Sequence, residues 1–220
     1  MKRSRTTLAA AFAATLAAGT GCAAQATTTP PPADAAAMAR ARADSLRHPW
    51  TEADARFMTN MIGHHAQAIV MANLVATHST SPAMKILAGR IINAQRDEIA
   101  TMQTWLRDRG RPVPQVDPAG ATSMAGHEHH AMMMPGMLTP EQLQELERAR
   151  GTGFDRLFLR YMIQHHSGAV QMVSELFSSY GAGQDETIFK FASDVNVDQT
   201  TEIARMQRML ADLLFGESSP

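Results

Sequence analysis

The sequence has one cysteine, few aromatic residues and almost no net charge. A single cysteine cannot form a disulfide within the chain, so the fold must depend on its core. Aromatic residues make up 5% of a chain that is 45% hydrophobic, and a core built from aliphatic residues and methionine favours helices over a β-sandwich. The formal net charge of −1 over 220 residues gives no reason to expect a nucleic-acid partner.

The chain also lacks an apolar run long enough to cross a bilayer. Its main apolar run, Leu8–Ala18, follows three basic residues and is typical of a secretory signal. Cys22 comes directly afterwards and resembles a bacterial lipoprotein cleavage site, although Gly19 stands where that pattern usually has leucine. We therefore expect a signal peptide at residues 1–22 with lipidation at Cys22, and plain signal cleavage is the alternative. Either route predicts an exported protein, periplasmic or anchored to a membrane of a bacterial envelope.

One domain should follow the export signal. Residues 23–48 are a low-complexity tether rich in Ala, Thr and Pro. Residues 49–215 are long enough to bury a core of their own. The expected parts of this domain are a helical hairpin at 51–110, a crossover at 111–138, a short helix at 139–150 and a second hairpin at 152–215.

The sequence contains an internal repeat centred on paired histidines. Residues 57–71 return as residues 158–172 without a gap, an offset of 165 − 64 = 101. Residues 95–103 return as 199–207, an offset of 199 − 95 = 104. The polar and sulfur-bearing residues shared by both copies include Met61, His64, His65, Gln95, Glu98 and Met102 in the first and Met162, His165, His166, Gln199, Glu202 and Met206 in the second. Imidazoles and thioethers are metal ligands, so the repeat points to metal chemistry.

The apolar residues around each histidine pair have helical spacing and fall on one side of a helix. Thr51 with Asp54 three residues later predicts a capping box, and Thr152 with Asp155 stands at the same offset. The other boundary signals are Ser81 before Pro82, Gly110, Thr139 with Gln142, and Gly181 with Gly183. A helical hairpin cannot bury its apolar face alone. We therefore predict an all-α fold, a four-helix bundle of two repeated helical hairpins.

The repeated Asp-x-x-Phe-x-x-x-Met-Ile-x-His-His-x-x-Ala pattern, with the later Gln-x-x-Glu-Ile-x-x-Met, resembles the bacterial family called domain of unknown function 305. The resemblance covers residues 49–214. It implies a ferritin-like helical bundle, and some members of that family are associated with periplasmic copper binding and tolerance. The copies differ at Gly63 and Gln164, a position where the family tolerates polar residues.

The predicted hairpins place the repeated polar residues at one depth. His65 comes level with Gln95, and His166 comes level with Gln199. Adjacent residues on a helix point about 100° apart, so both histidines of a pair cannot face the bundle axis. We expect His65 and His166 to be the more central pair, in a polar layer across an otherwise apolar bundle.

This layer has two interpretations. In the first it is a metal site whose ligands are His64, His65, His165, His166, Met61 and Met162. Met102 and Met206 would lie around these ligands, and Gln95 and Gln199 would orient the imidazoles. Glu98 and Glu202 would then orient imidazoles or act as ligands themselves. In the second, these same groups satisfy buried histidines without metal, and the methionines fill the core. The sequence alone leaves both interpretations open.

The crossover contains a second set of potential ligands. Residues 124–137 hold three histidines and five methionines in a stretch interrupted by Gly and Pro. The candidate ligands there are His127, His129, His130, Met132, Met133, Met134 and Met137. Thioethers select Cu(I) or Ag(I), and imidazole also suits Cu(II). Copper is therefore the expected metal, ahead of zinc, which would not explain the methionines, and of iron. A compositionally biased exposed linker is the alternative.

We expect a cell-envelope protein that sequesters copper or confers tolerance to it, and not an enzyme. Its partners would be the metal ion and, through a lipid on Cys22, the outer or cytoplasmic membrane; the sequence does not identify protein partners. One alternative is a ferritin-like di-metal redox enzyme, although such bundles use Glu-x-x-His motifs that this sequence lacks. Another alternative is a metal-free interaction module of the envelope.

Overall fold

The computed structural model of the chain describes residues 35, 39, 50–123 and 134–216. The expected signal peptide, the lipidation site Cys22 and most of the tether lie outside the described residues, and so do crossover residues 124–133. The elements from residue 50 onward are α2 (Glu52–His78), α3 (Pro82–Asp108), β1 (Gln115–Val116), β2 (Thr122–Ser123), α4 (Pro140–Arg148), α5 (Gly151–Ser178) and α6 (Glu186–Phe215). The predicted all-α class is confirmed, with one short antiparallel ladder of β1 and β2 in the crossover.

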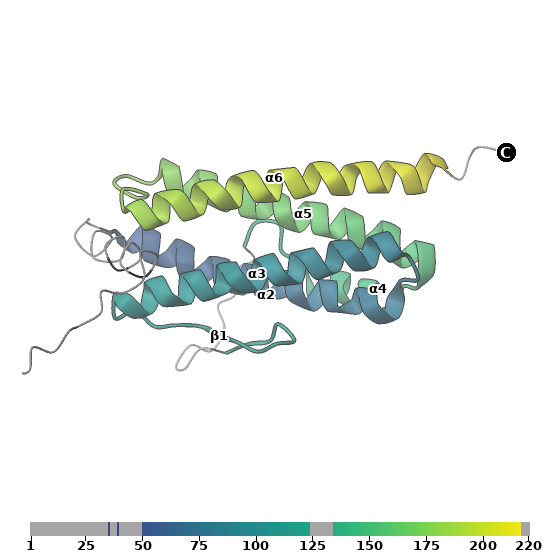
Figure 1. Cartoon of the computed structure of the whole chain (residues 1–220), viewed down its shortest axis with the longest axis horizontal. Helices are drawn as coiled ribbons and strands as arrows, with labels where there is room; N and C mark the ends of the chain where they lie inside the picture. Colours follow the sequence, from purple (N-terminus) through teal and green to yellow (C-terminus); the bar gives the residue numbers. More distant parts are fainter. Residues whose placement is uncertain (1–34, 36–38, 40–49, 124–133, 217–220) are drawn as a thin grey trace, which may run out of the picture.

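Four long helices form two hairpins that lie side by side (Figure 1). Helix α2 packs along α3, and α5 packs along α6. The hairpins meet mainly through α2 and α5, whereas α3 and α6 do not pack closely along one another. The short helix α4 lies against α2 and α5. This arrangement makes α2 and α5 the inner pair, and these two helices carry the histidines.

The helix ends show why the chain turns where it does. Thr51 caps α2: its hydroxyl accepts a hydrogen bond from Asp54 N at 3.2 Å, and the Asp54 carboxylate accepts one from Thr51 N at 2.7 Å. The expectation that Thr152 and Asp155 repeat this cap was wrong. Helix α5 begins at Gly151, and its N-cap residue makes no side-chain cap. Gly151 has φ +57, a left-handed conformation that turns the chain into the helix before Thr152 is reached.

Two apolar clusters fill the molecule, one on each side of the paired histidines. The first contains Phe57 and Met58 from the start of α2 with Val173 from the later half of α5. The second contains Val75 from the end of α2 with Phe158 from the earlier half of α5. Helices α2 and α5 are therefore antiparallel. Each fully buried large side chain contributes about 1.5–3 kcal/mol, so both ends of the bundle are held independently of the polar layer between them.

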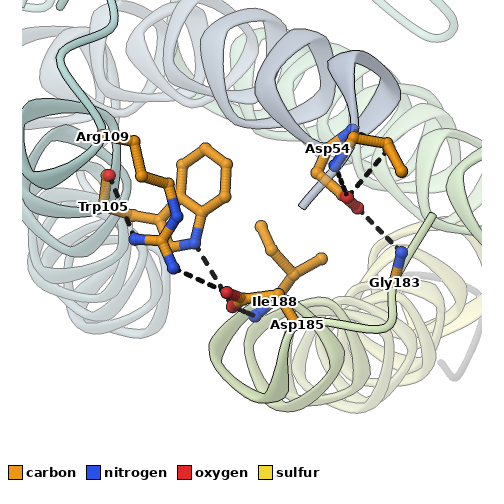
Figure 2. A network of polar contacts seen from close by, with 7 residues as sticks. Asp54, Trp105, Arg109, Gly183, Asp185 and Ile188 are labelled. Atoms are coloured by element: carbon orange, nitrogen blue, oxygen red, sulfur yellow. Dashed lines mark hydrogen bonds and ion pairs between the residues drawn. The ribbon is translucent and has the colours of Figure 1, made fainter. Parts of the chain in front are cut away.

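A buried polar network locks one end of the bundle (Figure 2). The Asp185 carboxylate accepts hydrogen bonds from Arg109 at 2.6 Å, from Trp105 Nε1 at 3.4 Å and from the Ile188 main chain at 3.1 Å. Beside it, Asp54 Oδ1 accepts from Gly183 N at 2.7 Å. The start of α2 and the end of α3 are thereby tied to the turn that precedes α6.

The first part of the crossover runs back along α2 and α3. Arg96 donates a hydrogen bond to the Pro118 carbonyl at 2.8 Å. Gly120, with φ +94, lies so close to α2 that an added Cβ would stand 2.6 Å from the Ala66 carbonyl oxygen. Of the helices that the structure describes, none combines the length and the apolar composition needed to cross a bilayer.

Candidate metal centre

The four repeated histidines form a buried layer between the two apolar clusters. His64, His65 and His166 are 0% exposed, and His165 is 1% exposed. Gln95 and Gln199 are buried as well. The structure thus brings the histidines and glutamines of both copies together in the middle of the bundle.

The central pair is His64 with His165. Their ring centroids lie 3.8 Å apart, with an angle of 39° between the ring planes. The expectation that His65 and His166 are the central pair was wrong. The two hairpins meet through α2 and α5, so the first histidine of each pair points across that contact. The second histidine of each pair points instead toward the outer helix of its own hairpin.

Each outer helix supplies a glutamate to the second histidine. His166 Nε2 donates a hydrogen bond to Glu202 Oε2 at 2.6 Å. His65 Nε2 lies 2.6 Å from Glu98 Oε2, but the contact lacks the angle of a hydrogen bond. The two glutamates are largely covered, with side chains 16% and 22% exposed. Glu98 and Glu202 follow Gln95 and Gln199, the residues expected level with these histidines, by about one helical turn.

Burial keeps the central histidines neutral. It lowers the pKa of His64 from 6.5 to about 3, and the neighbouring His65 adds to the effect, while the hydrogen bond to Pro135 opposes it. Burial also lowers the pKa of His165 well below its usual range, with further lowering by His64 and His166. A neutral imidazole has one N–H donor and one nitrogen with a lone pair. At neutral pH each central ring therefore offers one lone pair.

Each of the four rings has a nitrogen with no hydrogen-bond partner among the described residues: His64 Nδ1, His65 Nδ1, His165 Nε2 and His166 Nδ1. The opposite nitrogen of His64 donates to the Pro135 carbonyl at 3.0 Å. His78 offers a contrast within the same chain. It is 8% exposed, and both of its ring nitrogens have partners, Thr77 Oγ1 and the Glu147 carbonyl, each at 2.8 Å. A histidine with a purely structural role is thus fully satisfied here, whereas the four repeated histidines are not.

The end of the crossover is hydrogen-bonded to helix α2 at this layer. The sequence did not predict this arrangement. Gln67 donates to the Leu138 carbonyl at 3.0 Å and accepts from Leu138 N at 2.8 Å. Gly168 gives the crossover main chain room, because an added Cβ would stand 1.9 Å from the Pro135 carbonyl oxygen. Gln67 and Gly168 occupy equivalent positions of the two copies. A difference between the copies at this position was the signal that could have located the crossover.

The methionines are distributed differently from the histidines. Met61 and Met102 pack in the first apolar cluster, and Met162 and Met206 pack in the second. All four are fully buried, so they lie on opposite sides of the layer and serve as core residues. Met134 is half-buried, and its Cε lies 3.6 Å from the Cβ position of Gly63, next to His64. Met137 is also half-buried, and Met132, Met133 and the three crossover histidines lie outside the described residues.

The histidine nitrogens of this layer suit a soft or borderline metal ion, but the described residues do not form a complete ligand set. Within residues 50–123 and 134–216, no group of three or more His, Cys, Asp or Glu side chains is placed to hold a metal. The histidines instead offer unpartnered nitrogens on rings whose opposite nitrogens, in His64 and His166, are fixed by a carbonyl and a carboxylate. Fixing the opposite nitrogen is what orients an imidazole for metal ligation. Cu(I) accepts low coordination numbers and thioether ligands, so it suits such a set better than zinc.

Several proteins of known structure resemble the chain over most of its length. A DUF305 fragment from Deinococcus radiodurans is 28% identical, with a TM-score of 0.61, and the match covers 74% of this chain and 99% of that one. A DUF305 protein from Streptomyces coelicolor, described as secreted, is 27% identical, with a TM-score of 0.61 and coverage of 73% and 93%.

CopM in its Cu(II)-bound form is 32% identical, with a TM-score of 0.55 and coverage of 72% of this chain and 96% of that one. CopM structures also exist in Cu(I)-bound, Ag-bound and apo forms. No curated protein sequence matches the chain significantly. The family profile described as "Domain of unknown function (DUF305)" matches residues 54–210, and the chain therefore belongs to the DUF305 family.

Proposed function

We propose that this protein is an exported copper-binding protein that holds the metal as cargo, for sequestration or tolerance. Inside the bundle, His64, His65, His165 and His166 supply imidazole ligands. The crossover supplies further ligands, namely His127, His129, His130, Met132, Met133, Met134 and Met137. The protein binds and releases the ion and catalyses no reaction.

The observation that carries this proposal is the set of four buried imidazoles, each with a nitrogen that has no partner among the residues that the structure describes. Leaving a buried polar atom without a hydrogen bond costs about 1–3 kcal/mol. The chain could avoid that cost with a partner of the kind that His78 has. Metal ligation would supply the missing partner of one nitrogen in each of the four repeated histidines. The central rings are also kept neutral, as a ligand must be.

Two further observations support copper over other metals. CopM, which shares about a third of its residues with this chain, has been solved with Cu(I), Cu(II) and silver. Met134 contacts α2 at Gly63 and begins the described part of the crossover after the Met-rich segment. Thioether sulfur favours Cu(I) and Ag(I) over zinc or iron.

The location follows from the export signal. A basic stretch and an apolar run precede Cys22, and the Streptomyces coelicolor relative is described as secreted. We place the protein in the bacterial envelope. Acylation of Cys22 would anchor it to the membrane surface, and the low-complexity residues that follow would serve as a tether.

An anaerobic Cu(I) titration against a coloured competing chelator tests this function. Four chains are compared: the unchanged protein, His64→Asn with His165→Asn, a crossover variant, and His78→Asn as the control. The crossover variant replaces His127, His129, His130, Met132 and Met133 with serine. His78 is the matched control because it is a buried histidine whose two ring nitrogens are already occupied.

We expect the unchanged protein to remove Cu(I) from the chelator. The double histidine variant should lose one class of bound copper, the crossover variant should lose another, and His78→Asn should keep both. A protein that takes no Cu(I) from the chelator would refute the proposal. Equal losses in the His78 and His64/His165 variants would show that the histidine layer acts only through stability.

A further inference from the structure

A groove of about 500 Å³ lies between the outer helices α3 and α6. These helices do not pack closely along one another, so the seam between them is open. Phe191 and Val195 are buried beneath the groove. The polar residues that line it are Asp97, Glu98, Thr101, Glu186, Thr187, Lys190, Asp194 and Asp198.

The charge of the groove is strongly negative. Of the residues that the structure describes, five carboxylates and one cation line it, and that cation, Lys190, lies 2.5 Å from Asp194 in an ion pair. Partial burial raises the pKa of Asp198, and Glu98, Asp194 and Glu202 raise it further. Carboxylates from α3 and α6 are therefore close enough to repel one another. A concave surface with one sign of charge concentrates ions of the opposite sign.

The groove leads directly to the buried histidines. Glu98 forms part of its lining, and Glu98 Oε2 lies 2.6 Å from His65 Nε2. His65 is fully buried, and neither of its ring nitrogens has a hydrogen-bond partner among the described residues. Glu98 thus connects the acidic groove to a buried imidazole whose Nδ1 has no hydrogen-bond partner among the described residues. His64 Nε2, by contrast, donates a hydrogen bond to the Pro135 carbonyl of the crossover at 3.0 Å.

We propose that the acidic groove between α3 and α6 is the route by which metal cations reach the histidine layer from solvent. The inference rests on the proposed copper-binding function and adds to it the path of uptake. Asp194 and Asp198 attract the cation, and Glu98 stands between the groove and His65. The ligands themselves remain the histidines, so these two aspartates govern the rate of uptake and not the number of ions bound.

Stopped-flow mixing with Cu(II) chloride, read through quenching of tryptophan emission, tests the route. Asp194→Asn with Asp198→Asn removes two charges from the groove. The control, Glu147→Gln with Asp212→Asn, removes two exposed charges from elsewhere. Asp212 lies 14 residues beyond Asp198 on α6, about 21 Å along the helix. Lys190→Gln removes the single cation and reverses the sign of the change. Asp198→Asn alone leaves the ion pair of Lys190 and Asp194 intact.

At low ionic strength, the groove variant should bind Cu(II) about 3- to 10-fold more slowly than the unchanged protein. Lys190→Gln should bind it faster, and the control should match the unchanged protein. The differences should disappear at about 0.5 M salt, because screening acts over a few ångströms there. The number of ions bound should stay the same in every variant.

Equal association rates in the groove variant and the control at low salt would overturn the route and leave the proposed function standing. If the groove variant and the control both bind Cu(II) more slowly, and to the same extent, the effect comes from net charge in general. That result would also overturn the route. If the unchanged protein takes up no Cu(II), the inference fails. The proposed function fails with it only if the Cu(I) titration also shows no uptake.

Discussion

Mild acid should destabilise the metal-free protein because of His64. In the unfolded chain this side chain has a pKa near 6.5, and in the fold burial lowers the pKa to about 3. Between these values the unfolded chain binds a proton that the folded chain does not. The stability that neutral His64 contributes is therefore complete above pH 6.5 and is lost as the pH falls toward 3.

The size of this effect follows from the two pKa values. Going from pH 7 to pH 5, the free energy of unfolding should fall by about 2 kcal/mol from His64 alone. The lowered pKa of His165 acts in the same direction and increases the loss. The two rings interact at 3.8 Å, so their contributions will not be strictly additive.

Urea denaturation followed by circular dichroism, at pH 7 and pH 5 in the presence of a chelator, measures the effect. The comparison is between the unchanged protein and His64→Asn, which cancels the contribution of the carboxylates common to both. Met58→Leu serves as a control, because it alters a fully buried residue without a titratable group. His64→Asn should be about 2 kcal/mol less sensitive to this pH change than either of the others. Equal pH sensitivity in all three proteins would contradict a neutral, buried His64.

Four further substitutions test other parts of the structure. Gly168→Ala should destabilise the fold by about 1–3 kcal/mol, because its Cβ would collide with the crossover main chain; Gly89→Ala, which meets nothing within 4 Å, should stabilise helix α3 by about 0.5–1 kcal/mol in the same denaturation assay. Asp185→Ala should cost about 3–5 kcal/mol, because it removes the carboxylate that Arg109 contacts at 2.6 Å in a buried site; a loss below 1 kcal/mol would contradict this. Glu202→Gln should weaken Cu(I) binding about 10- to 100-fold in the chelator competition, since Glu202 accepts a hydrogen bond from His166 and orients that ring; unchanged affinity would exclude that role.

Much of the fold could be predicted because local signals decide it. Thr51 with Asp54, Ser81 before Pro82, and Thr139 with Gln142 mark helix starts by supplying hydrogen bonds to free main-chain N–H groups, and all three form in the structure. The periodicity of the apolar residues then fixes which face of each helix is buried.

The depth of the histidine layer in the bundle could be predicted from the sequence, but the arrangement of the side chains within the layer could not. Which histidine of a pair is central depends on which helices of the two hairpins touch, and periodicity within one helix does not contain that information. The contact between α2 and α5 puts His64 against His165. It also leaves α3 and α6 apart, and the acidic groove lies in that gap.

The position of the crossover was hidden in the differences between the two copies. The copies differ at Gly63 and Gln164 and again at Gln67 and Gly168. These are the positions where residues 134–138 cross the bundle: Gly63 faces Met134, Gln67 binds Leu138 on both main-chain atoms, and Gly168 makes room for Pro135. One crossover segment contacts two similar hairpins, so the residues that contact it differ between the two copies of the repeat.

Long-range ¹H–¹⁵N NMR spectra of the histidine rings, recorded before and after one equivalent of Ag(I) as a diamagnetic substitute for Cu(I), test the central claim most directly. Without metal, His64 should show a single neutral tautomer with its proton on Nε2, because that atom donates to Pro135. On addition of the ion, the signals of His64 Nδ1 and His165 Nε2, which lack hydrogen-bond partners among the described residues, should shift. The ring signals of His78, whose nitrogens are both occupied, should stay in place. Unchanged signals from all four repeated histidines, with Ag(I) bound elsewhere or not at all, would show that the layer is structural and would contradict the account.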